Sequence, residues 1–342
     1  MAVILVTGSN GHLMRNVIPK LLDHGHDVLG VDNFSRHTYY YHEKNDHFVE
    51  FEGDATDINS ILDIIKAYRH NYTKEPIDYI INGAATIFGV GGFNNYCSTV
   101  LNTDLKIQST MLTLAKELKV KKFVYISSSM VYEKCRKKYD GNREQEPFEE
   151  IPPPATEYGL SKYVGEKMVF AANKQYGLDY VIWRPFNILN PTEIAESVQG
   201  NSHVFADFIE QIVGQQKLEI PLIGDGQQIR CFTWIDDVAR AIADYSFMED
   251  NDPFKVYNIG VVDPIAMKDL AWLIASTANK MGLYPSKMLT FKTVKEYPND
   301  VKYRVPNVDK ITEKFGFKTT KTLEEGIEAC ILEYVKRNKN DS

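Results

Sequence analysis

The chain has 342 residues, of which 44% are hydrophobic and 25% are charged, and its formal net charge at pH 7 is −7. This length suits one large domain with a smaller lobe, and the mild acidity argues against nonspecific nucleic-acid binding and against docking on an anionic membrane. The opening apolar run Val3–Val6 is too short for a signal peptide, and no later run approaches a membrane span. We therefore expect a cytoplasmic protein with no membrane or nucleic-acid partner.

The four cysteines are Cys97, Cys135, Cys231 and Cys330, and no two of them form a CxxC pair. This scatter predicts neither a zinc site nor a disulfide framework, and so favours a reducing compartment and no bound metal.

The first thirty residues follow the order strand, glycine turn, helix, strand. Val3–Val6 and Val28–Val31 are β-rich apolar runs, and between them lies Thr7–Met14, a glycine-containing turn that leads into a helical pattern. Asp32 ends the second run. This arrangement is typical of a dinucleotide-binding unit, in which backbone amides at the helix start receive a diphosphate and the carboxylate takes ribose hydroxyls.

Two details of this unit refine the prediction. Gly8 and Gly11 match the expected glycine pattern, but the third glycine position is Met14, which leaves the close packing of helix on strand in question. Asp32 would repel a 2′-phosphate and so favours NAD over NADP, although Arg36 lies nearby.

The alternation of strands and helices continues down the chain. Small residues after the strand Tyr79–Asn82 would let a cofactor approach the backbone closely. Ligands of such sheets bind at the carboxyl ends of strands. The expected segments are the strand Phe48–Phe51 followed by Gly53-Asp54, the helix Ile58–Tyr68, the strand Tyr79–Asn82 followed by Gly83-Ala84-Ala85, the helix Ser98–Leu118 carrying Asn102, and the strand Phe123–Ile126 followed by Ser127–Tyr132.

Tyr158 and Lys162 lie four residues apart in a predicted helix and so share one face. A free tyrosine has a pKa of about 10, and a nearby ammonium group favours the phenolate. The pair is therefore a candidate proton-transfer unit for removing a hydroxyl proton while hydride leaves the adjacent carbon. Taken alone, the same spacing also fits a surface pair on a solvated helix.

Several motifs in order give the chain a family resemblance. It resembles the extended short-chain dehydrogenases/reductases of the nucleotide-sugar epimerase/dehydratase family, and most of all their UDP-glucose 4-epimerase-like branch. The motifs are Thr7-Gly8-x-x-Gly11, Val31–Ser35, Gly53-Asp54, Gly83-Ala84-Ala85, Ser127-Ser128-Ser129-x-Val131-Tyr132, Tyr158-x-x-x-Lys162, Arg184-Pro185-x-Asn187, Gly224-Asp225-Gly226 with Arg230, and Tyr257–Gly260.

The resemblance implies an α/β fold, with a Rossmann-type doubly wound parallel sheet and a smaller C-terminal α/β substrate-binding lobe. The NAD-binding part would span residues 1–186, with 232–261 returning to it, and the lobe would comprise 187–231 and 262–342. Within that lobe Lys217–Leu222 is expected to be a short strand, and Phe205, Phe208, Ile209 and Ile212 a helix face that packs on the core. His203 is taken as a polar surface residue.

The resemblance also assigns site residues. Tyr158 would be the base, Lys162 would hold the nicotinamide ribose and lower the pKa of Tyr158, and Ser128 would hydrogen-bond the reacting oxygen. The implied NAD contacts are Gly8, Asn10, Gly11, His12, Leu13, Asp32, Asn33, Asp54, Ala55, Ala84, Ala85, Asn102, Tyr158 and Lys162. The implied substrate contacts are Thr86, Ser129, Asn187, Arg230 and Arg304, with a surface salt bridge as the equal alternative for Arg304.

Departures from the family pattern narrow the chemistry. Ser129 and Met130 stand where family dehydratases carry Asp-Glu, and Met130 stands where decarboxylases carry Glu and 3,5-epimerases carry Cys. A thioether neither gives a proton nor acts as a useful base. Cys135 follows within a basic segment that favours thiolate, but a bystander role is preferred for it.

The resulting prediction is an NAD-dependent nucleotide-sugar epimerase that acts at C4 through a transient 4-keto sugar. The alternatives are a nucleotide-sugar 4-reductase, another epimerase of the family, and a catalytically silent protein that binds NAD and senses it. The expected partner is a nucleotide-diphosphate sugar. A homodimer is expected through Ser98–Leu118 and a helix over Tyr158–Ala172.

Overall fold

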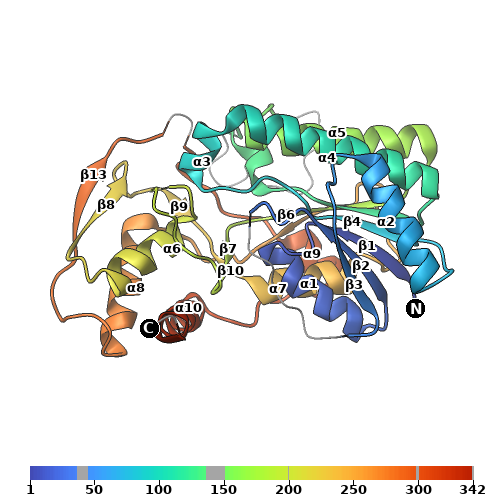
Figure 1. Ribbon diagram of the computed structural model, residues 1–342. Coiled ribbons are helices and arrows are strands. Elements are labelled where there is room, and N and C mark those ends of the chain that lie inside the picture. The colour runs from blue at the N-terminus through green and yellow to red at the C-terminus, as the bar shows by residue number, and fades with distance from the viewer. Residues whose placement is uncertain (37–44, 136–150, 199, 298–299, 341–342) are drawn as a thin grey trace.

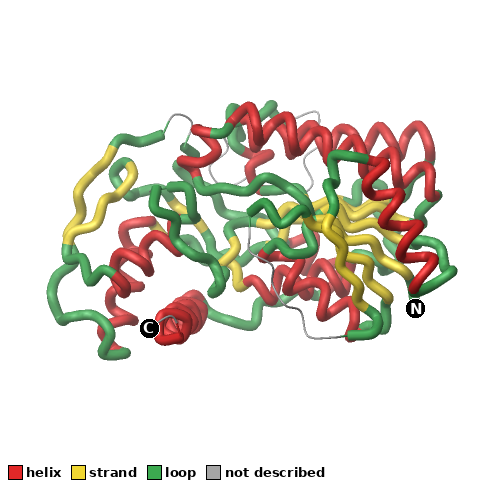
Figure 2. Tube along the Cα trace, in the orientation of Figure 1, coloured by secondary structure: helices red, strands yellow, loops and turns green. Residues whose placement is uncertain are grey.

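A seven-stranded, fully parallel sheet forms the centre of the computed structural model, which describes residues 1–36, 45–135, 151–198, 200–297 and 300–340 (Figures 1 and 2). The strand order is β11-β6-β5-β4-β1-β2-β3, so the chain reverses direction across the sheet between β1 and β4. This confirms the expected doubly wound sheet. Its strands are β1 (Val3–Thr7), β2 (Asp27–Asp32), β3 (Phe48–Glu52), β4 (Tyr79–Asn82), β5 (Lys122–Ile126), β6 (Tyr180–Pro185) and β11 (Val256–Ile259).

Helices cover both faces of this sheet, because its strands are apolar on both sides. In β1, Val3 and Leu5 face one hydrophobic cluster, whereas Ile4 and Val6 face another. The first cluster is covered by α2 (Ile58–Asn71), α4 (Cys97–Leu118) and α5 (Glu157–Tyr176), and the second by α1 (His12–Asp23), α7 (Ile235–Tyr245) and α9 (Asp309–Phe315).

A separate hydrophobic cluster holds together the elements on the left of Figure 1. Phe205, Phe208, Ile209 and Ile212 all belong to it, as the sequence predicts. Its elements are α6 (Val204–Ile209), a π-helical turn (Glu210–Gly214), β8 (Glu219–Ile223), α8 (Met267–Lys280), β13 (Thr290–Val294) and α10 (Leu323–Asn340). The remaining short elements are α3 (Val90–Asn95), the 3-10 turn Ser129–Tyr132, β7 (Ile188–Leu189), β9 (Ile229–Arg230), β10 (Thr233–Trp234) and β12 (Ile265–Ala266).

The chain comes back to the main sheet twice after residue 187. The expected return, α7 and β11, packs against α1 and pairs with β6. A second return, α9, is not anticipated by the sequence analysis, which places all of 262–342 in the lobe. Ile311 and Phe317 of this region are buried in the second cluster, between the sheet and helices α1 and α7. In the described part of the chain, no helix is both long enough and apolar enough to cross a membrane.

Candidate active site

A cavity of about 680 Å³ lies where β1, β4 and β5 end, and elements from the second half of the chain form its opposite wall. The volume falls within the usual range for small-molecule sites. Gly8, Gly83 and Ser127 line the side formed by the sheet, and Asn187 and Arg230 line the other.

The glycine turn after β1 is shaped for a close backbone approach. Gly8 has φ +69°, in the left-handed region, and a Cβ added there would lie 2.8 Å from the backbone of Ala84. Its amide donates to the Val31 carbonyl at 2.8 Å, and α1 begins four residues later at His12. The turn therefore leaves the start of α1 facing the cavity, as a dinucleotide diphosphate requires.

Met14, which replaces the third glycine, packs against Gly83 at the end of β4. A Cβ on Gly83 would lie 2.8 Å from both Cγ and Sδ of Met14, and Met14 itself is 2% exposed. The missing side chain at Gly83 thus makes room for the extra one at Met14, so helix and sheet still pack closely.

Asp32 is fixed at the end of β2 by two backbone amides. Its carboxylate accepts from Asn10 N at 3.0 Å and from Phe34 N at 2.8 Å. Asn10 is buried and does not line the cavity, and Asn102 does not line it either, because its amide donates to Ser98 on its own helix. All other residues expected to bind the cofactor line the cavity: Gly8, Gly11, His12, Leu13, Asp32, Asn33, Asp54, Ala55, Ala84, Ala85, Tyr158 and Lys162.

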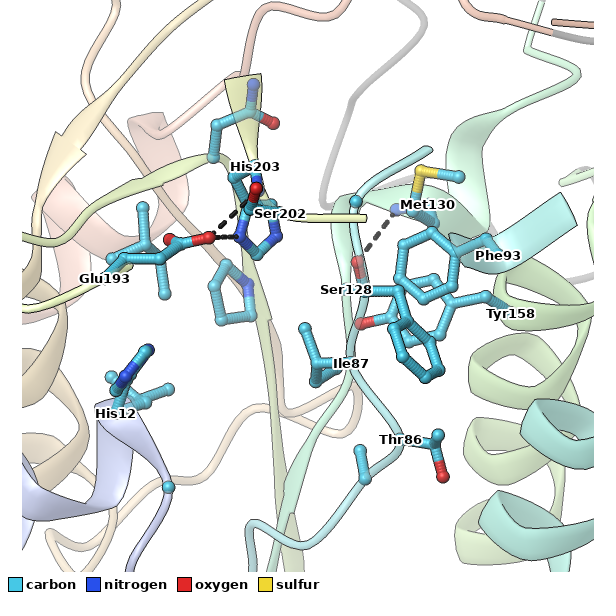
Figure 3. A pocket seen from close by; sticks show the side chains of 18 of the residues that line it. His12, Thr86, Ile87, Phe93, Ser128, Met130, Tyr158, Glu193, Ser202 and His203 are labelled. Carbon is cyan, nitrogen blue, oxygen red and sulfur yellow. Dashed lines mark hydrogen bonds and ion pairs between the residues drawn. The ribbon is translucent and has the colours of Figure 1, made fainter. Parts of the chain in front are cut away.

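Tyr158 lies in the first turn of α5, which begins after Thr156 accepts a hydrogen bond from Gly159 N at 3.1 Å. Its side chain reaches the cavity beside Ser128, and the ring of Phe93 from α3 lies flat on it (Figure 3). Burial raises the pKa of Tyr158 well above its usual value, and hydrogen bonding with Ser128 and the charge of Arg304 act in the opposite direction.

The charge of Arg304 lowers the pKa of Tyr158, and the expected effect of Lys162 on this pKa stays a prediction. Lys162 Nζ lies 5.7 Å from the centroid of the Tyr158 ring and donates to the Ile126 carbonyl at 3.2 Å. Burial lowers the pKa of Lys162, and the carboxylate of Asp104 raises it.

Asp104 is a buried acid on α4 that sequence reasoning does not single out. Its carboxylate accepts from Thr86 N at 2.8 Å and from Ser161 Oγ at 3.3 Å. Burial raises the pKa of Asp104, and the charge of Lys162 lowers it. The only sequence signal is an acidic residue on the helix face that also carries Val100, Ile107 and Met111.

Two arginines bring positive charge to the opposite wall. Arg230 and Arg304 are each 8% exposed, and Arg230 pairs with Asp300 at 2.9 Å. Burial and the proximity of the two guanidinium groups lower the pKa of Arg230, and burial lowers that of Arg304. Both remain charged at neutral pH because arginine ionises so far above it. The other expected substrate residues, Thr86, Ser129 and Asn187, also line the cavity.

His203 also lines the cavity, together with Glu193, whose carboxylate it contacts (Figure 3). From the sequence His203 is expected to be a polar surface residue, and Glu193 is not among the expected site residues. No local pattern marks either residue, because both lie in irregular chain between β7 and α6.

The sheet, the glycine turn and the acid at the end of β2 define a dinucleotide-binding fold. The sequence pattern of the NAD dependent epimerase/dehydratase family matches residues 4–260, so the chain belongs to this family of enzymes and NAD is its cofactor.

Relatives and solved structures agree with this assignment. The chain is 27% identical to a putative UDP-glucose 4-epimerase of Methanocaldococcus jannaschii, over 98% of this chain and 99% of that protein. It is 24% identical to GDP-mannose 3,5-epimerase of Arabidopsis thaliana, over 98% of this chain and 84% of the relative. A crystal structure of UDP-glucose 4-epimerase with UDP-glucose from Thermotoga maritima superposes with a TM-score of 0.80 at 25% identity, covering 98% of this chain and 99% of that one.

Proposed function

We propose that the protein is an NAD-dependent nucleotide-sugar epimerase that inverts C4 of its sugar through a transient 4-keto intermediate. The observation that carries this proposal is the wall around Tyr158. Ser128 and Tyr158 lie together there, and Met130 lines the cavity beside them (Figure 3). Elimination, decarboxylation or inversion at C3 and C5 needs a further acid or base, and the thioether of Met130 supplies none.

In the proposed mechanism Tyr158 takes the proton of the 4-hydroxyl, and Ser128 hydrogen-bonds the same oxygen. Bound NAD would supply the hydride chemistry at C4, so that the hydride removed from one face of this carbon could be returned to the other face. Lys162 holds the nicotinamide ribose. Arg230 and Arg304 hold the diphosphate, since guanidinium groups match phosphate in charge and geometry.

The substrate-binding lobe in this proposal consists of residues 187–231 and 262–342, without the segment around α9 that packs under the sheet. The implied partner is a nucleotide-diphosphate sugar. We further propose a cytoplasmic homodimer formed through α4 and α5, which pack against each other along the same face of the sheet. Light scattering at micromolar concentration should give the mass of two chains, and the mass of one chain would refute the dimer.

Proton NMR in heavy water tests the reaction. The protein is incubated with NAD and a panel of UDP-, GDP-, CDP- and dTDP-sugars. We expect one C4 epimer to form with no deuterium in the sugar, because hydride returns to the carbon it left. Deuterium at C3 or C5, or release of water or carbon dioxide, would contradict C4 epimerisation.

Two further outcomes separate the alternatives. Stoichiometric consumption of NADH or NADPH would identify a 4-reductase, and NAD binding without turnover on the whole panel would favour a silent NAD-sensing protein. The Tyr158→Phe variant should lose turnover while keeping NAD affinity, and near-normal turnover in this variant would refute the assigned base.

A further inference from the structure

Glu193 and His203 form a hydrogen-bonded pair that faces the cavity, across from Ser128 and Tyr158 (Figure 3). Nδ1 of His203 lies 2.8 Å from Glu193 Oε1, and the backbone amide of His203 donates to the same oxygen at 2.9 Å. The Glu193 side chain is 14% exposed and that of His203 is 50% exposed. The carboxylate is thus sequestered, whereas the ring can be reached from the cavity.

The double contact with Glu193 fixes the tautomer and the direction of the imidazole. Nδ1 carries a proton toward the carboxylate, so Nε2 lies on the far side of the ring. Figure 3 shows this nitrogen turned toward the open space of the cavity. Within the described part of the chain, Nε2 of His203 has no protein hydrogen-bond partner.

Charged groups from three other parts of the chain surround the pair. Asp207 of α6 raises the pKa of His203, whereas Arg36, after β2, lowers it. Arg36 is itself paired with Glu196. His12, the first residue of α1, lowers the pKa of Glu193. The pair therefore lies close to the end of α1 that faces a dinucleotide diphosphate.

Glu193 is the largest influence on His203. Its charge raises the pKa of His203, and burial only partly opposes it. In the other direction, burial works against ionisation of Glu193, but the charge and hydrogen bonds of His203 lower its pKa to about 2. The two groups therefore favour each other's charged forms, the imidazolium of His203 and the carboxylate of Glu193.

We propose that His203, oriented by Glu193, donates from Nε2 to a phosphate oxygen of a diphosphate bound in this cavity, and that the contact is made only by the protonated ring. The diphosphate is that of NAD or that of the nucleotide sugar, and the second source rests on the proposed function. A neutral ring with its proton on Nδ1 would instead present a lone pair to the phosphate, so binding and protonation are coupled.

The coupling has a defined sign. His203 is protonated below its raised pKa, where diphosphate affinity is fully present. Above that pKa the affinity falls, by up to tenfold per pH unit, until the still higher pKa of the complex is reached. Above the pKa of the free protein, binding takes up as much as one proton.

Titration calorimetry in two buffers of different ionisation enthalpy measures this proton uptake directly. NAD is titrated into the free protein, and then UDP and GDP into the NAD-saturated protein, between pH 6 and pH 9. The wild type should take up a proton in one of the two steps. His203→Gln should take up none in that step, and should bind about tenfold more weakly at pH 6. Glu193→Gln should keep the uptake but move it to lower pH, because the largest cause of the raised pKa is gone.

His47→Gln is the matched control. His47 Nδ1 lies 2.7 Å from Asp27 Oδ1, so it forms the same kind of pair, but neither residue lines the cavity. This variant should behave as wild type. A change in the NAD step assigns the contact to the cofactor, and a change only in the nucleotide step assigns it to the substrate.

Two outcomes would overturn the proposal. One is a proton uptake in His203→Gln equal to that of wild type in both steps. The other is equal pH profiles in Glu193→Gln and wild type. If neither UDP nor GDP binds while His203→Gln still alters the NAD step, the diphosphate contact stands, and it is the nucleotide-sugar proposal that loses support.

Discussion

The aromatic ring of Phe93 lies on that of Tyr158, with their centroids 4.1 Å apart and their planes inclined by 13°. Phe93 belongs to α3, which crosses from the end of β4 toward the second half of the chain. Two amides of this crossing, Gly89 N and Gly91 N, donate to the carbonyls of Asn201 and Gly200 at 2.6 and 2.8 Å. The burial that raises the pKa of Tyr158 is thus supplied in part by a segment that bridges the two halves.

Replacing Phe93 by alanine should lower the pKa of Tyr158, because water then reaches the phenol and stabilises its charged form. The rising limb of the pH–rate profile should move to lower pH, and phenolate absorbance should titrate earlier than in wild type. The double variant Phe93→Ala/Tyr158→Phe lacks this phenol. Subtracting its absorbance titration from that of Phe93→Ala therefore isolates the signal of Tyr158. Tyr72→Ala, which breaks the stacked pair Tyr68–Tyr72 outside the cavity, is the control. Equal titrations of Phe93→Ala and wild type would show that stacking does not set this pKa.

The pairing of Met14 with Gly83 predicts non-additive stability effects. Met14→Ala should cost about 2–5 kcal/mol of unfolding free energy, because it opens a cavity in the core. Gly83→Ala should also destabilise, since its Cβ meets Met14 at 2.8 Å and the Thr7 carbonyl at 2.9 Å. In the double variant the methionine clash is gone, so the loss should be smaller than the sum of the two single losses. Urea unfolding of the four proteins measures this difference, and strict additivity would contradict direct packing.

Glu166 and Arg184 form an ion pair with both side chains 0% exposed, and it ties α5 to β6. Arg184 Nε and Nη2 donate to the two carboxylate oxygens at 2.8 and 2.5 Å. Glu166→Gln should cost about 3–5 kcal/mol, because it leaves a buried guanidinium without its counter-charge. Asp63→Asn, which breaks the exposed pair with Lys66, should cost about 1 kcal/mol or less. If chemical denaturation gave similar losses of unfolding free energy for the two variants, the buried pair would stabilise the fold no more than the exposed pair does.

The burial of Asp104 predicts a pH dependence of stability. Because its pKa is raised in the folded protein, the folded state binds this proton more tightly than the unfolded state does. The contribution of Asp104 to the free energy of unfolding is fully present below its ordinary pKa of about 4. This contribution is lost as pH rises through the raised pKa, at a rate of at most about 1.4 kcal/mol per pH unit. Asp104→Asn should remove this decline, so the variant should gain stability relative to wild type between pH 4 and pH 7. Parallel curves from urea unfolding would refute the prediction.

The strands and helices follow from local sequence patterns, so most of the fold is predictable. The run Val3–Val6 becomes β1 with one added residue, and the expected helix over Tyr158–Ala172 becomes α5, from Glu157 to Tyr176. Lys217–Leu222 is shifted slightly, to β8 at Glu219–Ile223. Ends move because caps and neighbouring strands, rather than periodicity, decide where an element stops.

The cavity wall supplied by irregular chain is much less predictable. The cavity is lined by Phe93, Glu193 and His203 because α3 and the loop before α6 form part of its wall. No periodic pattern in the sequence predicts where these two segments lie. Asp104 is hidden for a different reason. It lies on a regular helix, but its importance depends on Thr86 and Ser161, which other elements bring to it.

Residues 89–93 join the two halves of the chain and also cover Tyr158. A displacement of this short segment that broke the hydrogen bonds of Gly89 and Gly91 to residues 200 and 201 would also move the ring of Phe93. Water would then reach the phenol of Tyr158. The ultraviolet absorbance of this tyrosine would in that case report on the position of the segment.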